Sequence, residues 1–278
     1  MKHTVLVPAW RRPDMLHACL TRLSKAASTG DVRVVVSLDR KGTLECRQVA
    51  EAFKASFADI YLRVMNHHQF HGNSYNVLSG VKDCLKLNGD LIHVVEDDIM
   101  VSLGYFTYHE AAHEAAPDAF AVSACRNQNL QGDAPGAAYR HPSYQSLGVS
   151  FRPDVAQEAV AHEKAVYYGD MVNYCGRVFP GSKIPPGHAE QDGLFNRIRE
   201  RGNGVTVYPA QPRAFHAGFY GYNRSGRKLT GSIERRSEKI LSMTSDEMNA
   251  LADQMKDHEV IDLDENLPVA AVREALAS

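Results

Sequence analysis

The sequence predicts an α/β fold, in which helices flank a doubly wound, mostly parallel sheet. Short β-branched runs alternate with segments of helical periodicity through the first hundred residues, which is typical of consecutive strand–helix units. Several of these predicted strands end in charged side chains, and ligands of doubly wound sheets bind at the carboxyl ends of strands. The 278 residues suit one large α/β domain or two small ones.

The first half is expected to contain four strands with three helices between them. The strands are expected at 3–10, 31–39, 60–66 and 90–95, and the helices at 11–27, 44–57 and 73–87. Pro13 and Asp14 mark the start of the first helix, where both residue types are favoured. The strand at 31–39 (DVRVVVSLD) is rich in β-branched residues.

The second half has a less regular pattern. We expect a helix at 105–116, a strand at 120–127, a loop at 127–144, a helix at 189–202 and a strand leading into a loop at 205–219. Segment 224–239 holds six Arg or Lys against two Glu, and segment 245–278 holds nine acids against two bases and is expected to form helices on the outer surface.

Composition excludes several classes of protein. The formal net charge of −2 gives no global field that would select an acidic partner. Five scattered cysteines without a CxxC pair predict neither a zinc site nor a disulfide framework. The first apolar run, 5–10, is too short for an export signal, and no run reaches the ~20 apolar residues of a membrane span. We therefore expect a cytoplasmic location.

Three carboxylates, Glu96, Asp97 and Asp98, follow an apolar strand in DLIHVVEDDIMVS. Crowded carboxylates repel one another, which raises their pKa values or requires a cation. Oxygen ligands suit Mg²⁺ or Mn²⁺, which commonly bind one or two carboxylates together with substrate phosphates. A solvated acidic turn or a helix N-cap is the alternative. The position of the triplet after the last of four predicted strands favours the cation.

Two other strand ends carry candidate binding residues. Asp39 ends the second strand, where it can accept hydrogen bonds from a nucleobase or ribose, or simply form a turn. Arg11 and Arg12 follow the first strand, where an arginine can reach a phosphate or stack on a base. The alternative for these arginines is solvated charge at the start of a helix.

The order AWRRP, SLD and EDD after successive strands resembles that of GT-A nucleotide-sugar glycosyltransferases, in particular the N-acetylglucosaminyltransferase I type. The resemblance covers residues 3–220, and its most specific element is VVEDDIMVSLGYFTY. It implies a GT-A fold and a Mn²⁺ or Mg²⁺ ion bound by Asp98. It also implies that the donor sugar nucleotide is bound by Pro8, Trp10, Arg12, Asp39, Glu96 and Asp97.

The resemblance also implies a catalytic base at the start of a helix in the second half. Asp192 in HAEQDGLFNRI matches best, although Gly193 stands where the family has a bulky residue, and this departure leaves Glu190 as a rival. Helix capping by either acid is the alternative. His216 is a candidate to approach the metal or the diphosphate, as a histidine does in many GT-A enzymes, although the N-acetylglucosaminyltransferase I pattern does not require it.

The expected activity is a metal-dependent, inverting transfer of a sugar from a nucleoside diphosphate sugar to an acceptor hydroxyl. The metal would act as a Lewis acid on the leaving diphosphate, and Asp192 would deprotonate the acceptor. The expected organisation is a nucleotide-sugar-binding half (1–102), an acceptor half of the same domain (103–223) and a basic loop with an acidic tail (224–278). A nucleotidyltransferase is the alternative, but PAWRRPD lacks the Gly-rich loop expected of one. A non-catalytic binding module would be expected to have lost the acidic triplet.

The acceptor is the least defined part of this hypothesis. It could be a glycan or a hydroxymethylated pyrimidine in DNA, in a bacterial or phage-infected cell. The basic segment 224–239 could contact DNA phosphates, or it could fold over the donor diphosphate, which we prefer. The cluster of His67, His68 and His71 is expected to be a solvated loop rather than a metal site.

Overall fold

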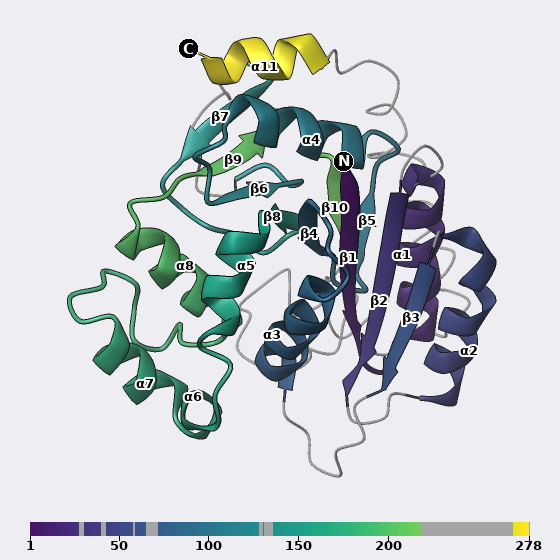
Figure 1. Cartoon of the computed structure of the whole chain (residues 1–278), viewed down its shortest axis with the longest axis horizontal. Coiled ribbons are helices and arrows are strands. Elements are labelled where there is room, and N and C mark those ends of the chain that lie inside the picture. The colour runs from purple at the N-terminus through teal and green to yellow at the C-terminus, as the bar shows by residue number, and fades with distance from the viewer. Residues whose placement is uncertain are drawn as a thin grey trace, which may run out of the picture.

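The computed structural model describes residues 1–27, 31–39, 43–57, 59–64, 72–127, 130, 136–217 and 269–277. Within these ranges, eight strands form one mixed sheet and two more form a small separate sheet, with helices packed around them (Figure 1). The predicted α/β class with a mostly parallel sheet is confirmed.

The first half follows the predicted alternation of strands and helices. Its strands are β1 (Lys2–Ala9), β2 (Asp31–Leu38), β3 (Asp59–Val64) and β4 (Leu91–Val94). Its helices are α1 (Pro13–Ala26), α2 (Leu44–Ala52) and α3 (Gly72–Leu85), with a short 3₁₀ helix, η3 (Lys54–Ser56), after α2. These four strands are mutually parallel, in the order β3-β2-β1-β4.

The second half extends the same sheet in a mixed arrangement. β8 (Val149–Phe151) pairs antiparallel with β4 and with β6 (Ala121–Ser123), and β6 pairs parallel with β9 (Thr206–Pro209). β5 (Ile99–Val101) and β10 (Ala214–His216) form the separate antiparallel pair. The helices are α4 (Tyr105–Ala115), α5 (Pro153–Val160), α6 (Ala165–Gly169), α7 (Met171–Val178), α8 (Gln191–Arg201) and α11 (Val269–Ala277).

Two expectations for the second half are wrong. The predicted loop at 127–144 contains a strand, β7 (Ala138–His141), which pairs antiparallel with β9 and contacts α11. These contacts come from distant segments, so local composition does not reveal the strand. The strand predicted to lead into a loop at 205–219 is present as β9, but the expected loop contains a second strand, β10, which belongs to the other sheet. Of the acidic tail, only α11 lies within the described residues, and the basic segment 224–239 lies outside them.

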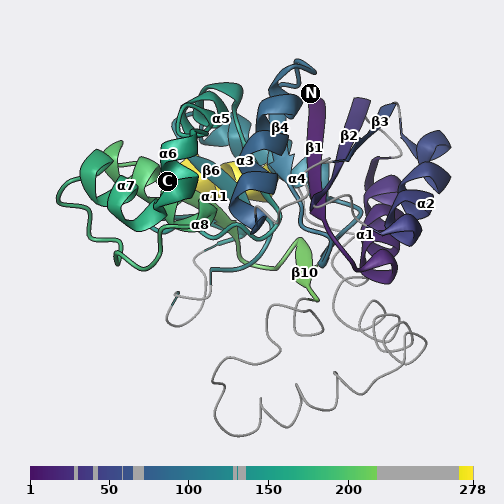
Figure 2. The ribbon, with the colours of Figure 1, turned by 90° about the horizontal axis from the view of Figure 1, so that it is seen from below.

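Successive side chains of β1 point to opposite faces of the sheet and pack in two different hydrophobic clusters. Val5 and Val7 pack in a cluster with α1 and α2, whereas Leu6 packs in a second cluster with α3, α5 and α8. Figure 2 shows α1 and α2 on one side of the first strands and α3 and α5 on the other. Both faces of the parallel strands are therefore covered, and ligands of such sheets bind beyond the carboxyl ends of the strands.

Buried histidines join the amino-terminal part of the sheet to α4. The Nδ1 of His3 lies 3.0 Å from Nε2 of His93, and one ring nitrogen of His109 and one of His113 lie 2.6 and 2.9 Å from Oγ of Ser150. His109 and His113 are one helical turn apart, a spacing at which two histidines can share a metal. No group of three or more His, Cys, Asp or Glu that could hold a metal occurs among the described residues.

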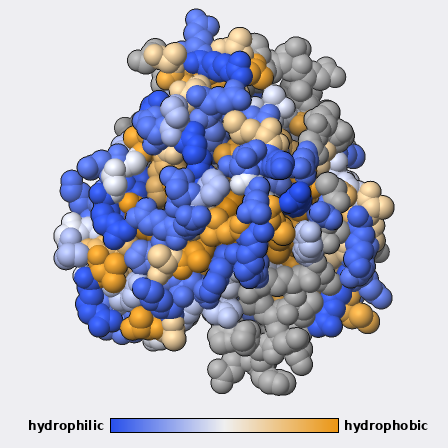
Figure 3. All heavy atoms as spheres, in the orientation of Figure 1, coloured by the Kyte–Doolittle hydropathy of each residue, from blue (hydrophilic) through white to orange (hydrophobic). Residues whose placement is uncertain are grey.

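The molecular surface is mostly hydrophilic on the face seen in Figure 3, with interspersed hydrophobic patches. Val166 of α6 and Val172 of α7 are among the exposed hydrophobic side chains. No helix in the described part of the chain is long and apolar enough to cross a membrane. All five cysteines are free and buried.

Candidate functional site

The parallel strands bring the three predicted motifs to one edge of the sheet. β1 lies between β2 and β4, so Arg12 after β1, Asp39 after β2 and the triplet after β4 occupy adjacent strand ends. Asp39, Asp97 and Asp98 are only 3%, 2% and 6% exposed. Pro8 is buried within β1, and Trp10 is half-buried just beyond it. The predicted donor-binding residues thus lie on neighbouring elements.

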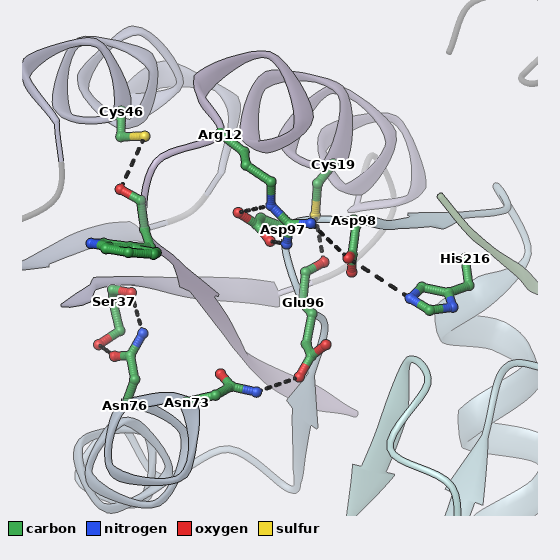
Figure 4. Close-up of polar contacts among 11 residues, drawn as sticks. Arg12, Cys19, Ser37, Cys46, Asn73, Asn76, Glu96, Asp97, Asp98 and His216 are labelled. Atoms are coloured by element: carbon green, nitrogen blue, oxygen red, sulfur yellow. Dashed lines mark hydrogen bonds and ion pairs between the residues drawn. The ribbon is translucent and has the colours of Figure 1, made fainter. Parts of the chain in front are cut away.

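Arg12 bridges two carboxylates of the triplet (Figure 4). Its Nη1 donates to Oδ2 of Asp98 at 2.9 Å, its Nε donates to Oδ2 of Asp97 at 3.3 Å, and its Nη2 bonds Oδ1 of Asp97. Burial alone would lower the pKa of Arg12, but the charges of the two carboxylates raise it. The structure shows Arg12 as the counter-ion of the acidic triplet, and its expected contact with the nucleotide stays a prediction.

One guanidinium does not neutralise the whole triplet. Burial and the nearby charges of Asp98 and Asp192 raise the pKa of Glu96 to about 8. Burial raises the pKa of Asp97 to about 6, although Arg12 opposes the shift. Burial also disfavours the charged form of Asp98, but the nearby imidazole of His216 and the charge of Arg12 lower its pKa to about 2. Asp98 is therefore ionised at neutral pH, and the cluster favours an additional cation.

Strand register brings His216 to Asp98. β10 pairs with β5 so that His216 is opposite Ile99, and the backbone N–H of Ala217 donates to the carbonyl of Asp98 at 2.8 Å. The Nε2 of His216 consequently lies 3.8 Å from Oδ2 of Asp98. From the sequence, His216 was only a candidate to approach the metal or the diphosphate. The antiparallel pairing of β10 with β5 explains why it lies beside Asp98.

The chemistry of this pair fits a divalent cation. None of the described residues donates a hydrogen bond to Oδ1 of Asp98, although that atom is buried. A buried carboxylate oxygen of this kind needs a partner, and an oxygen with a nearby imidazole suits Mn²⁺ or Mg²⁺. Asp98 and His216 would supply two ligands to such an ion, and donor phosphates and water would fill the remaining positions.

Two buried thiols hold the backbone at the strand ends. Sγ of Cys46 in α2 lies 3.6 Å from the carbonyl oxygen of Trp10, and Sγ of Cys19 in α1 lies 3.7 Å from that of Glu96 (Figure 4). Burial raises the pKa of both thiols, so they remain protonated. The cysteines act here as small buried groups with weak S–H donors rather than as nucleophiles.

The two candidate bases lie at the start of α8. Glu190 occupies the N-cap position, but its side chain makes no capping hydrogen bond, and Asp192 lies in the first turn. The side chain of Asp192 is exposed, yet the protein around it is close enough for desolvation to raise its pKa, against hydrogen bonds from Ser146 and Gln191. The charge of Asp192 also contributes to the raised pKa of Glu96, and the choice between Asp192 and Glu190 as the base stays a prediction.

Gly193 has a local structural reason. A Cβ at this position would lie 1.7 Å from the backbone oxygen of His188, so no other residue fits without moving the preceding turn. The buried guanidinium of Arg197 donates to the carbonyl oxygens of Ile184, Pro185, His188 and Gly193 and holds that turn against α8. The path of the turn therefore gives a structural reason for glycine at the position where the family has a bulky residue.

Sequence reasoning missed the polar residues in the first turn of α3. Asn73 donates to Oε1 of Glu96 at 3.0 Å, and Asn76 donates to the carbonyl of Ser37 in β2 at 3.0 Å. Ser74 accepts a hydrogen bond from the first turn of α8. The run GNSYN at the start of a helix was the available signal, since such polar groups can contact neighbouring strand ends. The histidines at 67, 68 and 71 lie outside the described residues.

Comparisons with known proteins agree with this arrangement. Residues 2–152 match the sequence model of a family described as Glycosyltransferase like family 2. The fold is similar to that of TarS from S. aureus, at 13% identity and a TM-score of 0.51 over 93% of this chain and 44% of TarS, so the chain spans less than half of that protein. It is also similar to TarS 1–349 in complex with UDP-GlcNAc, at 12% identity and a TM-score of 0.50 over 100% of this chain and 71% of the other. No curated protein sequence is significantly similar to the chain.

Proposed function

The chain belongs to the family described as Glycosyltransferase like family 2, and from this premise we propose that it is a metal-dependent, inverting enzyme. It would transfer a sugar from a nucleoside diphosphate sugar to an acceptor hydroxyl. Membership of this family decides against the nucleotidyltransferase alternative. The finer likeness to the N-acetylglucosaminyltransferase I type, the cytoplasmic location and the division at 102 and 223 stay predictions.

The observation that supports the proposal most strongly is the convergence of three acidic groups with different environments. Asp98 is ionised and leaves one buried oxygen without a hydrogen bond from the described residues, which fits a metal ligand. Glu96 has a raised pKa, so it can donate as well as accept hydrogen bonds near neutral pH. Asp192 is exposed on a separate helix beside them. Groups whose environments separate their pKa values are candidates for different catalytic roles.

These residues would divide the work of sugar transfer. A cation held by Asp98 and His216 would stabilise the charge of the departing diphosphate. Asp192 would accept the proton of the acceptor hydroxyl at its carboxylate, and its raised pKa makes that carboxylate a better base near neutral pH. Glu96, half-buried and hydrogen-bonded to Asn73, would contact the donor, as would Asp39 and Trp10. One dedicated base implies direct displacement and hence inversion at the anomeric carbon.

For the donor, UDP-GlcNAc is the first compound to test, because it is the ligand named for the similar TarS structure. For the acceptor, we propose a glycan hydroxyl. Modified DNA remains a second hypothesis that rests on the composition of segment 224–239, which lies outside the described residues.

The test compares Asp192→Asn with Glu190→Gln, two neighbouring carboxylates altered in the same way. UDP release from UDP-GlcNAc with Mn²⁺ is followed, with water as the acceptor, and UDP binding is measured by calorimetry. Asp192→Asn should keep UDP affinity and lose turnover by at least ~100-fold, the lower end for general-base catalysis. Glu190→Gln should remain close to wild type. Turnover that survives in Asp192→Asn and falls in Glu190→Gln would transfer the role of base to Glu190.

A further inference from the structure

The first turn of α3 contacts two parts of the site that are far apart in the sequence. Asn73 donates to Oε1 of Glu96, at the end of β4, with a distance of 3.0 Å. The next residue, Ser74, accepts a hydrogen bond at 2.9 Å from the backbone N–H of Gln191, which is 117 positions away and immediately precedes Asp192. Two consecutive side chains of one helical turn thus link the acidic triplet to the helix that carries the candidate base.

The hydrogen bond from the backbone N–H of Gln191 to Ser74 takes the place of an N-cap hydrogen bond, which α8 lacks. The first N–H groups of a helix have no partner within the helix and are usually capped by the N-cap side chain. In α8 the N-cap is Glu190, whose side chain makes no such bond. Ser74 is 4% exposed, and its hydrogen bond to Gln191 is buried, so water does not substitute for it. The start of α8 is therefore capped by a different helix, and its position is tied to α3.

A second side chain holds the same turn from the other direction. The hydroxyl of Tyr167 in α6 donates to the carbonyl of Ala189 at 2.9 Å and also interacts with Ser74. Ala189 and Tyr167 are both buried. Ser74 and Tyr167 together hold the backbone on both sides of Glu190, just before Asp192. This arrangement constrains the backbone from which the carboxylate of Asp192 extends.

We propose that Ser74 is a positioning residue, which together with Asn73 sets the placement of Asp192 relative to Glu96. The inference rests on the proposed function, because Asp192 acts there as the base and Glu96 contacts the donor. Ser74 would not touch the substrate itself. Its effect would be on turnover, since a base displaced by about 1 Å can cost up to ~100-fold in rate. Donor affinity would change little, because the metal ligands and Asp39 lie on other elements.

The test uses Ser74→Ala, Ser74→Thr and, as a matched control, Ser79→Ala. Ser79 is also buried in α3 at 4% exposure, and its hydroxyl donates to the carbonyl of Tyr75 within the same helix. Ser79→Ala also removes a buried hydroxyl group from α3. The hydrogen bond lost in this variant lies within α3, whereas the one lost in Ser74→Ala connects α3 to α8. Ser74→Thr retains the hydroxyl. The probes are UDP release from UDP-GlcNAc with Mn²⁺, calorimetric UDP binding, and amide hydrogen exchange of peptides that cover residues 189–194.

We expect Ser74→Ala to lower kcat by at least ~10-fold, below the full cost of a 1 Å displacement, with UDP affinity within about twofold of wild type. The backbone amide of Gln191 should exchange faster in Ser74→Ala than in wild type. Ser79→Ala should match wild type in both kcat and amide exchange. Ser74→Thr should recover a substantial part of kcat. Unchanged kcat and exchange in Ser74→Ala, or an equal loss in Ser79→Ala, would overturn the inference.

Failure of the proposed function would look different. If wild type releases no UDP, the proposed donor chemistry fails for this probe, while exchange at residues 189–194 still decides whether Ser74 fixes the start of α8. If wild type is active and Asp192→Asn is not, an active Ser74→Ala variant with unchanged exchange contradicts only the positioning role.

Discussion

Replacing Arg12 with Gln should destabilise the protein when no divalent cation is present. Arg12 is the basic side chain that the structure shows bonded to both Asp97 and Asp98, whose side chains are only 3% and 8% exposed. Glutamine keeps a hydrogen-bonding group but removes the positive charge. Two buried aspartates would then face each other and Glu96 without that counter-ion.

The magnitude follows from burial. Removing one partner of a buried ion pair costs about 3–5 kcal/mol. The side chain of Arg12 is 20% exposed, so water relieves part of the penalty and the lower end, about 3 kcal/mol, is expected. For a chain of this size, that loss corresponds to a melting temperature lowered by roughly 6–12 °C.

Thermal unfolding in chelator, followed by circular dichroism, measures this effect. Arg11→Gln is the matched control, because Arg11 is exposed and stacks over the Trp10 ring at 4.4 Å, a contact that contributes about 1 kcal/mol or less. Adding Asp97→Asn to Arg12→Gln should recover part of the stability, since it removes the unpaired charge. Equal melting temperatures for Arg12→Gln and Arg11→Gln in chelator would refute the role of Arg12 as counter-ion.

Three further outcomes are expected. Calorimetric UDP binding should require Mn²⁺ or Mg²⁺ in wild type and lose that dependence in Asp98→Ala; equal wild-type binding in excess chelator would contradict a metal site. His113 has its pKa lowered to about 3, chiefly by burial, so as the pH falls below about 6.5 the unfolded chain takes up the proton first. Stability measured by urea denaturation should therefore fall by about 2 kcal/mol more between pH 7.5 and 5.0 in wild type than in His113→Gln, and equal losses would refute this. If segment 224–239 binds DNA through four phosphates, affinity measured by fluorescence anisotropy should drop by over ~100-fold between about 50 and 200 mM salt, and absent or salt-insensitive binding to unmodified and hydroxymethylated duplexes leaves the glycan.

The part of the site that could be predicted lies at the ends of parallel strands. Strand–helix alternation is a local signal, and a parallel arrangement brings the carboxyl ends of strands to one edge. Arg12, Asp39 and the triplet at 96–98 could therefore be grouped from the sequence alone. Their contacts could not, because the pairing of Arg12 with Asp97 and Asp98 depends on side-chain geometry rather than on strand order.

The remaining parts depend on contacts between distant segments. β7 has little local strand character and pairs at the edge of the sheet through β9. Ser74 and Gln191 are 117 residues apart, and no spacing in the sequence relates them. Gly193 looked like a departure from the expected pattern, yet a Cβ there would collide with the backbone of His188. Sequence patterns report the periodicity of one element, whereas these features arise where two elements meet.

Arg12 and a divalent cation need not compete for Asp98 under the proposed function. The guanidinium bonds Oδ2 of Asp98, while Oδ1 of the same carboxylate receives no hydrogen bond from the described residues. A cation on Oδ1 would leave the Arg12 bond intact, and Arg12 would continue to hold the carboxylate in one orientation. The imidazole of His216 and the charge of Arg12 together lower the pKa of Asp98, so this carboxylate would not have to release a proton to bind a cation. On this reasoning Arg12 prepares the metal site, and its removal should weaken metal-dependent UDP binding as well as the fold.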